Sequence, residues 1–213
     1  MIIPGRFNGP PGSGNGGYSA GVFADGEPYE VTLRLPPPLD TPLSLVEGRV
    51  RDPDGAVVAE VTPTGAVDTV VPPIGYAAAQ RASTAYVGFT GHPFPTCYVC
   101  GPDRSDGLGI FPGPVADGRT AAPWTVPDDV SPPMVWAALD CPGGWAIIGP
   151  ERPYVLGRIA VQLERMPAPG DQCVVVGELA TAQGRKALVH STLYGPDGAE
   201  LARARATWIA VAG

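Results

Sequence analysis

One carboxylate interrupts the most apolar stretch of the sequence. From residue 131 to residue 148 the chain reads SPPMVWAALDCPGGWAII, and Asp140 is its only charged side chain. An apolar pattern on all sides is typical of a helix that is buried in a core. A buried carboxylate is costly unless another group pairs with it or a reaction uses it. We therefore expect Asp140 to serve catalysis or substrate contact.

A structural role is the alternative for Asp140. The run Pro142-Gly143-Gly144 predicts that the helix ends just after this residue, where an acid could cap the helix end. A carboxylate near the C-terminus of a helix, however, lies at the negative end of the helix dipole and is not stabilised there. Capping is therefore the weaker interpretation.

Two cysteines have a spacing that zinc sites use. Cys97 and Cys100 form the motif CYVCG. Structural zinc usually takes four ligands, often as two close pairs, and this sequence has no second pair. The two histidines, His92 and His190, stand alone. We expect a tight turn at the motif, free thiols at all four cysteines and no bound metal.

Part of the sequence is repeated. Residues 34–40 read RLPPPLD and residues 165–171 read RMPAPGD, so both follow Arg-X-Pro-X-Pro-X-Asp. A run rich in β-branched and aliphatic residues follows each motif, as is typical of a strand. Each copy then reaches a Pro-Asp-Gly turn, at residues 53–55 and 196–198, and another short apolar run. Three matched features in the same order indicate an internal duplication. The second copy contains more residues than the first. We expect its additional segment, GRKALVHSTLYG, to form an additional or longer strand.

A helix candidate precedes the repeated motif in each copy. The candidates are GNGGYSAGVFAD, residues 14–25, and SPPMVWAALDC, residues 131–141. Residues 62–96 are rich in Pro, Thr and Gly, and we expect a linker and the opening strand of the second copy there. The predicted units are an N-terminal half, truncated, at residues 1–75 and a C-terminal half at residues 76–213.

Composition excludes several classes of function. The 213 residues carry a net charge of −7 without a basic run, which argues against a nucleic-acid partner. No segment approaches the roughly 20 apolar residues that span a bilayer. The N-terminal sequence lacks the charged start and apolar run of a secretory signal, so we expect a cytoplasmic protein.

The duplicated pattern of a central apolar helix followed by antiparallel strands resembles the hotdog fold of acyl-CoA thioesterases and dehydratases. The resemblance is clearest over residues 156–211. The segment CYVCGPDRSDGLGIFPG, residues 97–113, is similar to the Cys-rich Gly-Leu turn at the front of many thioesterase-like hotdog domains. The resemblance implies an α+β double hotdog, with two curved antiparallel sheets each wrapped around one central helix.

In the family, a Gly-Gly pair opens the helix and an acid follows seven residues after the second Gly. The first copy has Gly16-Gly17 but Ala24 at the acid position. The second copy has Asp140 but Pro133 at the second Gly position. Hotdog active sites lie between two units, so the resemblance implies that only one interface, pairing the glycines of the first helix with the acid of the second, is complete.

The resemblance implies hydrolysis of an acyl thioester, with acyl-CoA as the substrate and no cofactor. The N–H groups at a helix start carry partial positive charge, so the amides of Gly17 and Tyr18 could hold the thioester carbonyl oxygen. Asp140 would act as a general base on water or as a nucleophile, and the sequence leaves both roles open.

Further substrate contacts are expected from Asn8, Asn15, Gly16, Trp136 and Arg185. Each has a structural alternative. Asparagine favours helix starts, so Asn15 could cap the first helix. An exposed arginine is most often a solubilising charge, and an apolar tryptophan most often belongs to the core.

Two other functions remain open at this stage. A double hotdog with one site lost could bind acyl-CoA or a fatty acyl group without turnover, since fold alone does not fix activity. A hotdog dehydratase or hydratase is disfavoured because no Asp-X-Asn-X-X-His run occurs and neither histidine falls on a predicted helix. Catalysis needs a second polar group near Asp140 to position water, with candidates Gln162, Thr207, Ser191 and Arg158. Self-association into a homo-oligomer is also expected.

Overall fold

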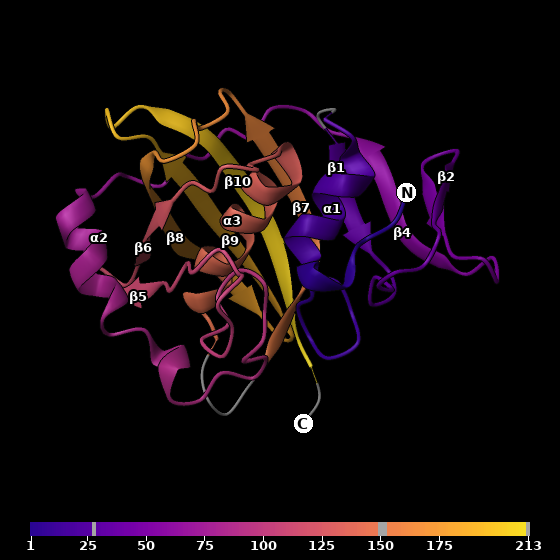
Figure 1. The fold of residues 1–213 in the computed structure, drawn as a ribbon, viewed down its shortest axis with the longest axis horizontal. Coiled ribbons are helices and arrows are strands. Elements are labelled where there is room, and N and C mark those ends of the chain that lie inside the picture. Colours follow the sequence, from indigo (N-terminus) through magenta and orange to yellow (C-terminus); the bar gives the residue numbers. More distant parts are fainter. Residues whose placement is uncertain (27–28, 149–152, 212–213) are drawn as a thin grey trace.

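A single ten-stranded antiparallel sheet with helices packed on it forms the framework of the molecule (Figure 1). This computed structural model describes residues 1–26, 29–148 and 153–211. The elements before residue 75 are η1 (Gly5–Phe7), α1 (Gly16–Ala24), β1 (Tyr29–Leu33), β2 (Ser44–Val46), β3 (Arg49–Arg51) and β4 (Val57–Pro63). Those after it are α2 (Tyr76–Ser83), η2 (Val87–Phe89), β5 (Gly113–Pro114), β6 (Thr120–Thr125), α3 (Pro132–Trp145), β7 (Tyr154–Leu163), β8 (Gln172–Gln183), β9 (Lys186–Tyr194) and β10 (Glu200–Ala210).

The order of the strands has an internal twofold pattern. The sheet runs β2-β3-β4-β1-β7-β10-β9-β8-β6-β5, so β2-β3-β4-β1 matches β8-β9-β10-β7 in reverse. The two sets join where β1 pairs with β7, with Val31 opposite Ile159. Each set has one apolar helix before its first strand. The strand order and the paired helices are those of a double hotdog, as the sequence predicted, but the two predicted sheets are joined into one continuous sheet where β1 pairs with β7.

The repeated motifs occupy equivalent connections in the two halves. Residues 34–40 join β1 to β2, and residues 165–171 join β7 to β8. The two Pro-Asp-Gly turns join β3 to β4 and β9 to β10. The additional residues of the second copy lengthen the β8–β9 hairpin, whose first-half counterpart has strands of only three residues each. The duplication therefore sets both the order and the connections of the strands.

The two central helices pack against each other in antiparallel orientation, on the same face of the sheet (Figure 1). A Cβ atom on Gly17 would lie 2.6 Å from the Asp140 Cβ, and one on Gly21 would lie 2.7 Å from the Pro133 Cα. Glycine at these two positions lets the backbones approach closely. This contact brings the start of α1 to the side chain of Asp140.

The predicted end of the second helix is wrong. The sequence predicts an interruption at Pro142, but α3 continues to Trp145. Proline forfeits one helical hydrogen bond, while its carbonyl accepts a hydrogen bond from Thr120 Oγ1 at 2.6 Å. A Cβ atom on Gly144 would lie 2.5 Å from the Trp208 ring, so the glycine allows the helix to lie close to the sheet.

The predicted opening strand of the second half is also misplaced. Among the described residues, no strand lies between the end of β4 and the start of β5; this segment holds α2 and η2 instead. The side chains of Val71 and Ala79 cover Val174 and Val176 of β8 on the outer side, and the opening strands are β5 and β6. The division of the chain into residues 1–75 and 76–213 stays a prediction.

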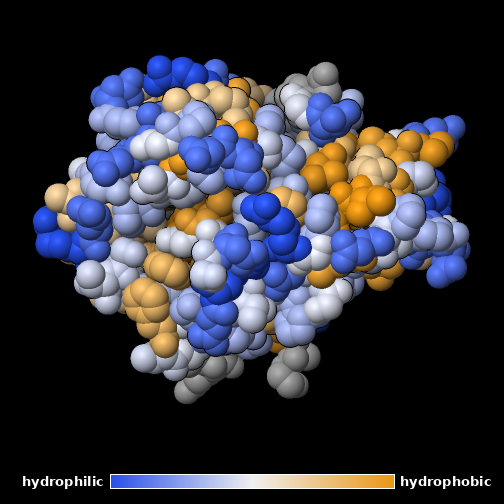
Figure 2. Space-filling view, viewed as in Figure 1, coloured by the Kyte–Doolittle hydropathy of each residue, from blue (hydrophilic) through white to orange (hydrophobic). Residues whose placement is uncertain are grey.

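On the face shown in Figure 2, apolar residues gather over the β2 end of the sheet. Leu45 and Val46 of β2 are among its exposed large apolar side chains. Within the described ranges, no helix is long and apolar enough to cross a membrane.

Candidate active site

The start of α1 is fixed by Asn15. This residue is the N-cap, and its Oδ1 accepts a hydrogen bond from the Tyr18 N–H at 2.9 Å. Asparagine is among the preferred N-cap residues because its side chain satisfies one of the unpaired N–H groups of the first turn. Gly16 and Gly17 follow as the first two helical residues. The cap thereby holds their N–H groups in a defined direction.

Asp140 meets this helix start. The Gly17 N–H donates to Asp140 Oδ2 at 2.9 Å, and the Asn15 side-chain amide donates to the same oxygen at 3.5 Å. Asp140 is only 2% exposed. Its second oxygen, Oδ1, is buried and has no hydrogen-bond partner within the described residues. One carboxylate oxygen is therefore held in place by two donors, while the other makes no hydrogen bond within the described residues.

The environment makes Asp140 an unusual carboxyl group. Burial, the largest effect, raises its pKa to about 7, and the hydrogen bond from the Gly17 amide opposes that rise. Desolvation disfavours the charged form of an acid, whereas N–H donors favour it. A carboxyl group with such a pKa can accept and return a proton near neutrality.

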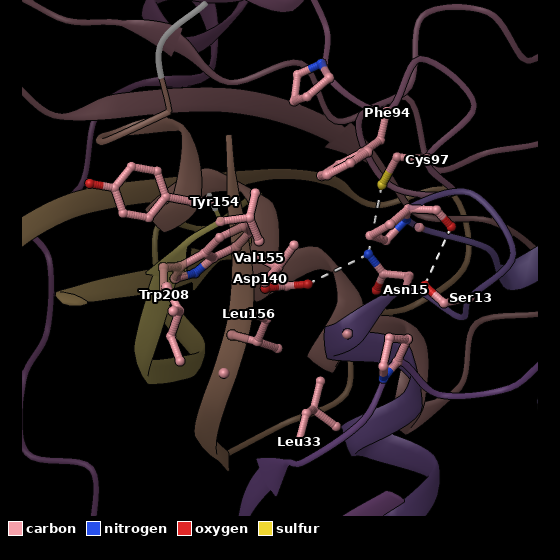
Figure 3. A pocket seen from close by; sticks show the side chains of 18 of the residues that line it. Ser13, Asn15, Leu33, Phe94, Cys97, Asp140, Tyr154, Val155, Leu156 and Trp208 are labelled. Atoms are coloured by element: carbon pink, nitrogen blue, oxygen red, sulfur yellow. Dashed lines mark hydrogen bonds between the residues drawn. The ribbon is translucent and has the colours of Figure 1, made fainter. Parts of the chain in front are cut away.

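A cavity of about 410 Å³ opens at this carboxylate (Figure 3). Its polar lining includes Asn15, Gly16, His92, Asp140 and Arg185. The remaining walls are mostly apolar and include Leu33, Leu35, Phe94, Leu156, Trp208 and Ile209. A pocket with a few polar groups and an apolar wall is the usual form of a small-molecule site.

The amides predicted to hold a substrate carbonyl are both engaged within the protein. The Gly17 N–H binds Asp140, and the Tyr18 N–H binds the Asn15 cap. In the part of the chain that the structure describes, the Gly16 N–H has no acceptor, and Gly16 lines the cavity. The unengaged N–H of this helix turn therefore precedes the predicted pair by one residue.

The structure brings Asn15, Gly16, Asp140 and Arg185 together around the cavity. The Arg185 Nε donates to the Ala210 carbonyl at 3.0 Å, which holds this side chain at the cavity wall.

Four other predicted residues, Asn8, Gly17, Tyr18 and Trp136, lie outside the cavity lining. Asn8 donates to the Thr96 carbonyl at 3.0 Å and accepts from Arg104, so it ties two loops together. The ring of Tyr18 stacks on Phe7 with their centroids 3.7 Å apart. Trp136 is buried, and its Cβ would lie 2.9 Å from a Cβ on Gly21.

None of the four candidates for positioning water lines the cavity. Gln162 accepts from the Val67 N–H at 3.0 Å, and Arg158 donates to Thr32 Oγ1 at 2.9 Å. Asn15, which the sequence analysis placed among the substrate contacts and helix caps, instead donates a side-chain hydrogen bond to Asp140 at 3.5 Å.

Sequence reasoning missed a group of thiols in the wall of the cavity. Cys97, Cys100 and Cys141 all line it, together with His92 and Trp145. Asn15 links this group to the carboxylate, since its amide also contacts Cys97 Sγ at 3.7 Å (Figure 3). The Cys-X-X-Cys spacing signals two of the three thiols, whereas the third comes from α3 and no local pattern connects it to them.

The fold and the site define a class: a double-hotdog protein with one carboxylate facing a helix start at the junction of its halves. No protein-family model and no curated protein matches the chain. Solved structures that resemble it include a thioesterase superfamily protein, with 16% identity and a TM-score of 0.49 over 55% of this chain. The match covers 61% of that protein's length.

Two further solved structures are similar over about half of the chain. The PaaI protein from the phenylacetic acid degradation operon of E. coli has 13% identity and a TM-score of 0.46, covering 50% of this chain and 82% of its own. A hypothetical thioesterase from Streptococcus pneumoniae, solved with coenzyme A, has 12% identity and a TM-score of 0.43, covering 47% and 84%. The double-hotdog assignment itself rests on the strand order and the paired helices described above.

Proposed function

We propose that the protein hydrolyses an acyl thioester, with acyl-CoA as the substrate class. The observation that carries this proposal is the 2.9 Å hydrogen bond between the Gly17 amide and Asp140, whose side chain lines the cavity. It joins a backbone donor of one half to an acid of the other. The pair lies beside an apolar pocket that suits an acyl chain.

The substrate carbonyl oxygen would accept a hydrogen bond from the free Gly16 N–H, which lies at the positive end of the α1 dipole. A donor of this kind typically contributes about 3–4 kcal/mol to transition-state stabilisation. The Gly17 N–H would keep the Asp140 carboxylate in place, so that Oδ1 faces the reacting atoms.

The reaction needs water and one proton acceptor. Asp140 Oδ1 would take a proton from water as the water oxygen bonds to the thioester carbon. The carbon–sulfur bond would then break, and the same proton would neutralise the departing thiolate. Direct attack by Asp140 on the carbonyl, followed by hydrolysis of the resulting anhydride, is the other form of the same proposal.

Arg185 at the cavity wall supports CoA as the leaving group. Its Nε is engaged with a backbone carbonyl, and the other guanidinium nitrogens could reach phosphate oxygens. Self-association and a cytoplasmic location stay predictions.

A second candidate function is binding of an acyl-CoA without turnover. The engagement of both the Gly17 and the Tyr18 N–H within the protein favours it, because only the Gly16 N–H of this helix turn is then left to stabilise an oxyanion. The two functions share a ligand and differ in whether the carbon–sulfur bond breaks.

A panel of acyl-CoAs of different chain lengths and aromatic acyl groups tests the proposal, with release of free CoA thiol as the readout. We expect turnover of at least one member, and its loss in the variant Asp140→Asn. Saturable binding without thiol release would favour the second function. Hydrolysis at the wild-type rate by Asp140→Asn would exclude Asp140 as the reacting acid.

A further inference from the structure

Three buried thiols meet beside the candidate active site. Cys97 and Cys100 come from the turn before β5, and Cys141 comes from α3. Their Sγ atoms all lie within 4.8 Å of one another, and each residue is at most 5% exposed. The fourth cysteine, Cys173 on β8, is also buried but lies outside this cluster. We call Cys97, Cys100 and Cys141 the thiol cluster.

Hydrogen-bond donors are directed at Cys100 Sγ. Trp145 Nε1–H donates to it at 3.4 Å, and His92 Nε2 lies 3.3 Å from it. The Phe94 N–H donates to His92 Nδ1 at 2.8 Å, so Nδ1 is an acceptor and the proton of the neutral ring lies on Nε2. Both contacts to Cys100 are therefore N–H donors, which favour the thiolate form of the sulfur.

Cys97 has the same kind of surroundings. The Asn15 side-chain amide donates toward Cys97 Sγ at 3.7 Å. Donors of this kind stabilise the negative charge of metal-bound thiolates and orient the ligands, as partners behind metal ligands generally do. Two of the three N–H donors reach Cys100 and one reaches Cys97, so two of the three sulfurs have a donor that stabilises a thiolate.

The backbone of the CYVCG turn is fixed independently of the sulfurs. The Gly101 N–H donates to the Cys97 carbonyl at 2.9 Å, and the Ile110 N–H donates to the Val99 carbonyl at 3.0 Å. A Cβ atom on Gly101 would lie 2.5 Å from the Cys97 nitrogen, so a side chain does not fit there. The two cysteines are therefore held in position by the turn and not by each other.

We propose that the thiol cluster binds one Zn²⁺ ion through three thiolates, with the fourth coordination position on the cavity side. Zinc bonded to thiolates at about 2.3 Å in a tetrahedron places the sulfurs about 3.8 Å apart. The sulfurs already lie within 4.8 Å of one another, so binding needs movements of about 1 Å or less. Each thiol loses its proton to solvent on binding, and the N–H donors offset part of the remaining negative charge.

The proposed ion would support the geometry of the neighbouring carboxylate. Cys141 directly follows Asp140 on α3, and Asn15 contacts both Asp140 and Cys97. A metal would therefore join the turn, α3 and the start of α1 at one point. The proposal holds whether or not the chain hydrolyses a thioester, since it concerns binding of the ion alone.

Metal binding to the full-length reduced protein tests the proposal directly. Titration with Co²⁺ should saturate at one ion per chain and give the charge-transfer absorption of cobalt–thiolate bonds. Zn²⁺ should displace the cobalt and protect three of the four thiols from alkylation. Serine substitutions at Cys97, Cys100 and Cys141 should each weaken Co²⁺ binding by more than about 10-fold, whereas Cys173→Ser, a matched buried control, should bind as the wild type does.

A further variant keeps the three ligands and removes one donor. His92→Phe should weaken Co²⁺ binding by about 10- to 100-fold, the usual effect of losing a partner behind a metal ligand. This variant and the wild-type titration test whether the thiol cluster binds the ion even if a serine variant does not fold.

Three results would overturn the zinc site. One is the absence of saturable Co²⁺ binding by the reduced wild type. Another is a loss in Cys173→Ser as large as in the cluster variants. The third is a Cys97–Cys100 disulfide in the freshly purified protein that persists in the presence of zinc.

Discussion

The Gly17 N–H and Asp140 Oδ2 lie 2.9 Å apart although 123 residues separate them in the sequence. The amide comes from the first turn of α1, and the carboxylate comes from the last two turns of α3. Because the helices are antiparallel and the backbones touch at glycines, one helix start meets one acid. One partner of this hydrogen bond thus precedes β1 in the chain, and the other precedes β7.

Asp140→Asn is expected to abolish most thioester hydrolysis while the protein remains folded. The loss of a general base or nucleophile typically lowers the rate by about 100- to 10,000-fold. The free energy of unfolding should stay equal or rise, because the substitution removes a buried carboxylate whose Oδ1 has no partner among the described residues. Thiol release and chemical denaturation measure the two effects.

The control for this variant is Asp25→Asn. Asp25 is the exposed C-cap of α1 and adopts a left-handed conformation, with φ of 49°, that asparagine also tolerates. We expect wild-type activity and stability. A rate loss in Asp25→Asn as large as in Asp140→Asn would mean that the assay follows stability and not the site.

Asn15 is expected to act as a positioning residue whose two functions can be separated. Asn15→Ser keeps an acceptor for the Tyr18 N–H but removes the amide that faces Asp140, so kcat should fall by about 10-fold with little change in stability. Asn15→Ala also removes the cap and should cost a further ~1 kcal/mol of unfolding free energy. Equal kcat in the wild type and both variants would show that the amide does not assist Asp140.

Gly17→Ala is expected to lower the free energy of unfolding by about 1–3 kcal/mol, the usual cost of overpacking. The new Cβ would lie 2.6 Å from the Asp140 Cβ and 2.7 Å from the Trp136 carbonyl oxygen, and neither can move aside unless the helices separate. This cost exceeds the gain of up to about 1 kcal/mol in helix propensity. Gly65→Ala, where a Cβ meets no atom within 4 Å, is the control and should be nearly neutral. Denaturant titrations that rank the two variants the other way would contradict the close packing of α1 on α3.

The pairing of β1 with β7, where the two halves of the sheet join, predicts that the whole chain unfolds cooperatively. Ile159 on β7 is fully buried opposite Val31 on β1. Ile159→Ala should lower the unfolding free energy by about 2–5 kcal/mol through loss of burial and a residual cavity. Leu179→Ala, on an exposed part of β8, should change it by about 0.5 kcal/mol or less. Calorimetry should give one transition in each case, and two separate transitions would mean that the halves fold independently.

Much of this architecture could be predicted from local patterns. The paired Arg-X-Pro-X-Pro-X-Asp motifs and Pro-Asp-Gly turns identified the duplication, because a repeated sequence specifies repeated connections. The all-round apolar pattern identified α3 as a buried helix, and its residues from Met134 to Trp145 are buried. The spacing of Gly17 and Asp140 in the two copies, set against the hotdog pattern, predicted that these residues would meet.

Other features could not be predicted, for reasons that lie in long-range packing. Pro142 and two glycines predict a helix end in isolation, but α3 continues because its last turn packs against the sheet. The Gly17 and Tyr18 amides looked free because the sequence does not reveal that Asp140 and Asn15 would occupy them. The CYVCG motif seemed to lack further ligand residues because Cys141 belongs to a different element.

The sequence by itself determined the repeat, the two central helices and the single acid that could serve a site between them. The repeat and the helices follow from sequence motifs and apolar patterning, which act over short stretches of chain, whereas the resemblance to the hotdog pattern implied the role of the acid. The tertiary structure alone decided which amide is free, which oxygen of Asp140 is unpartnered and which thiols meet. Those relationships depend on how closely two helix backbones approach each other, and that distance is set by packing between residues more than a hundred positions apart.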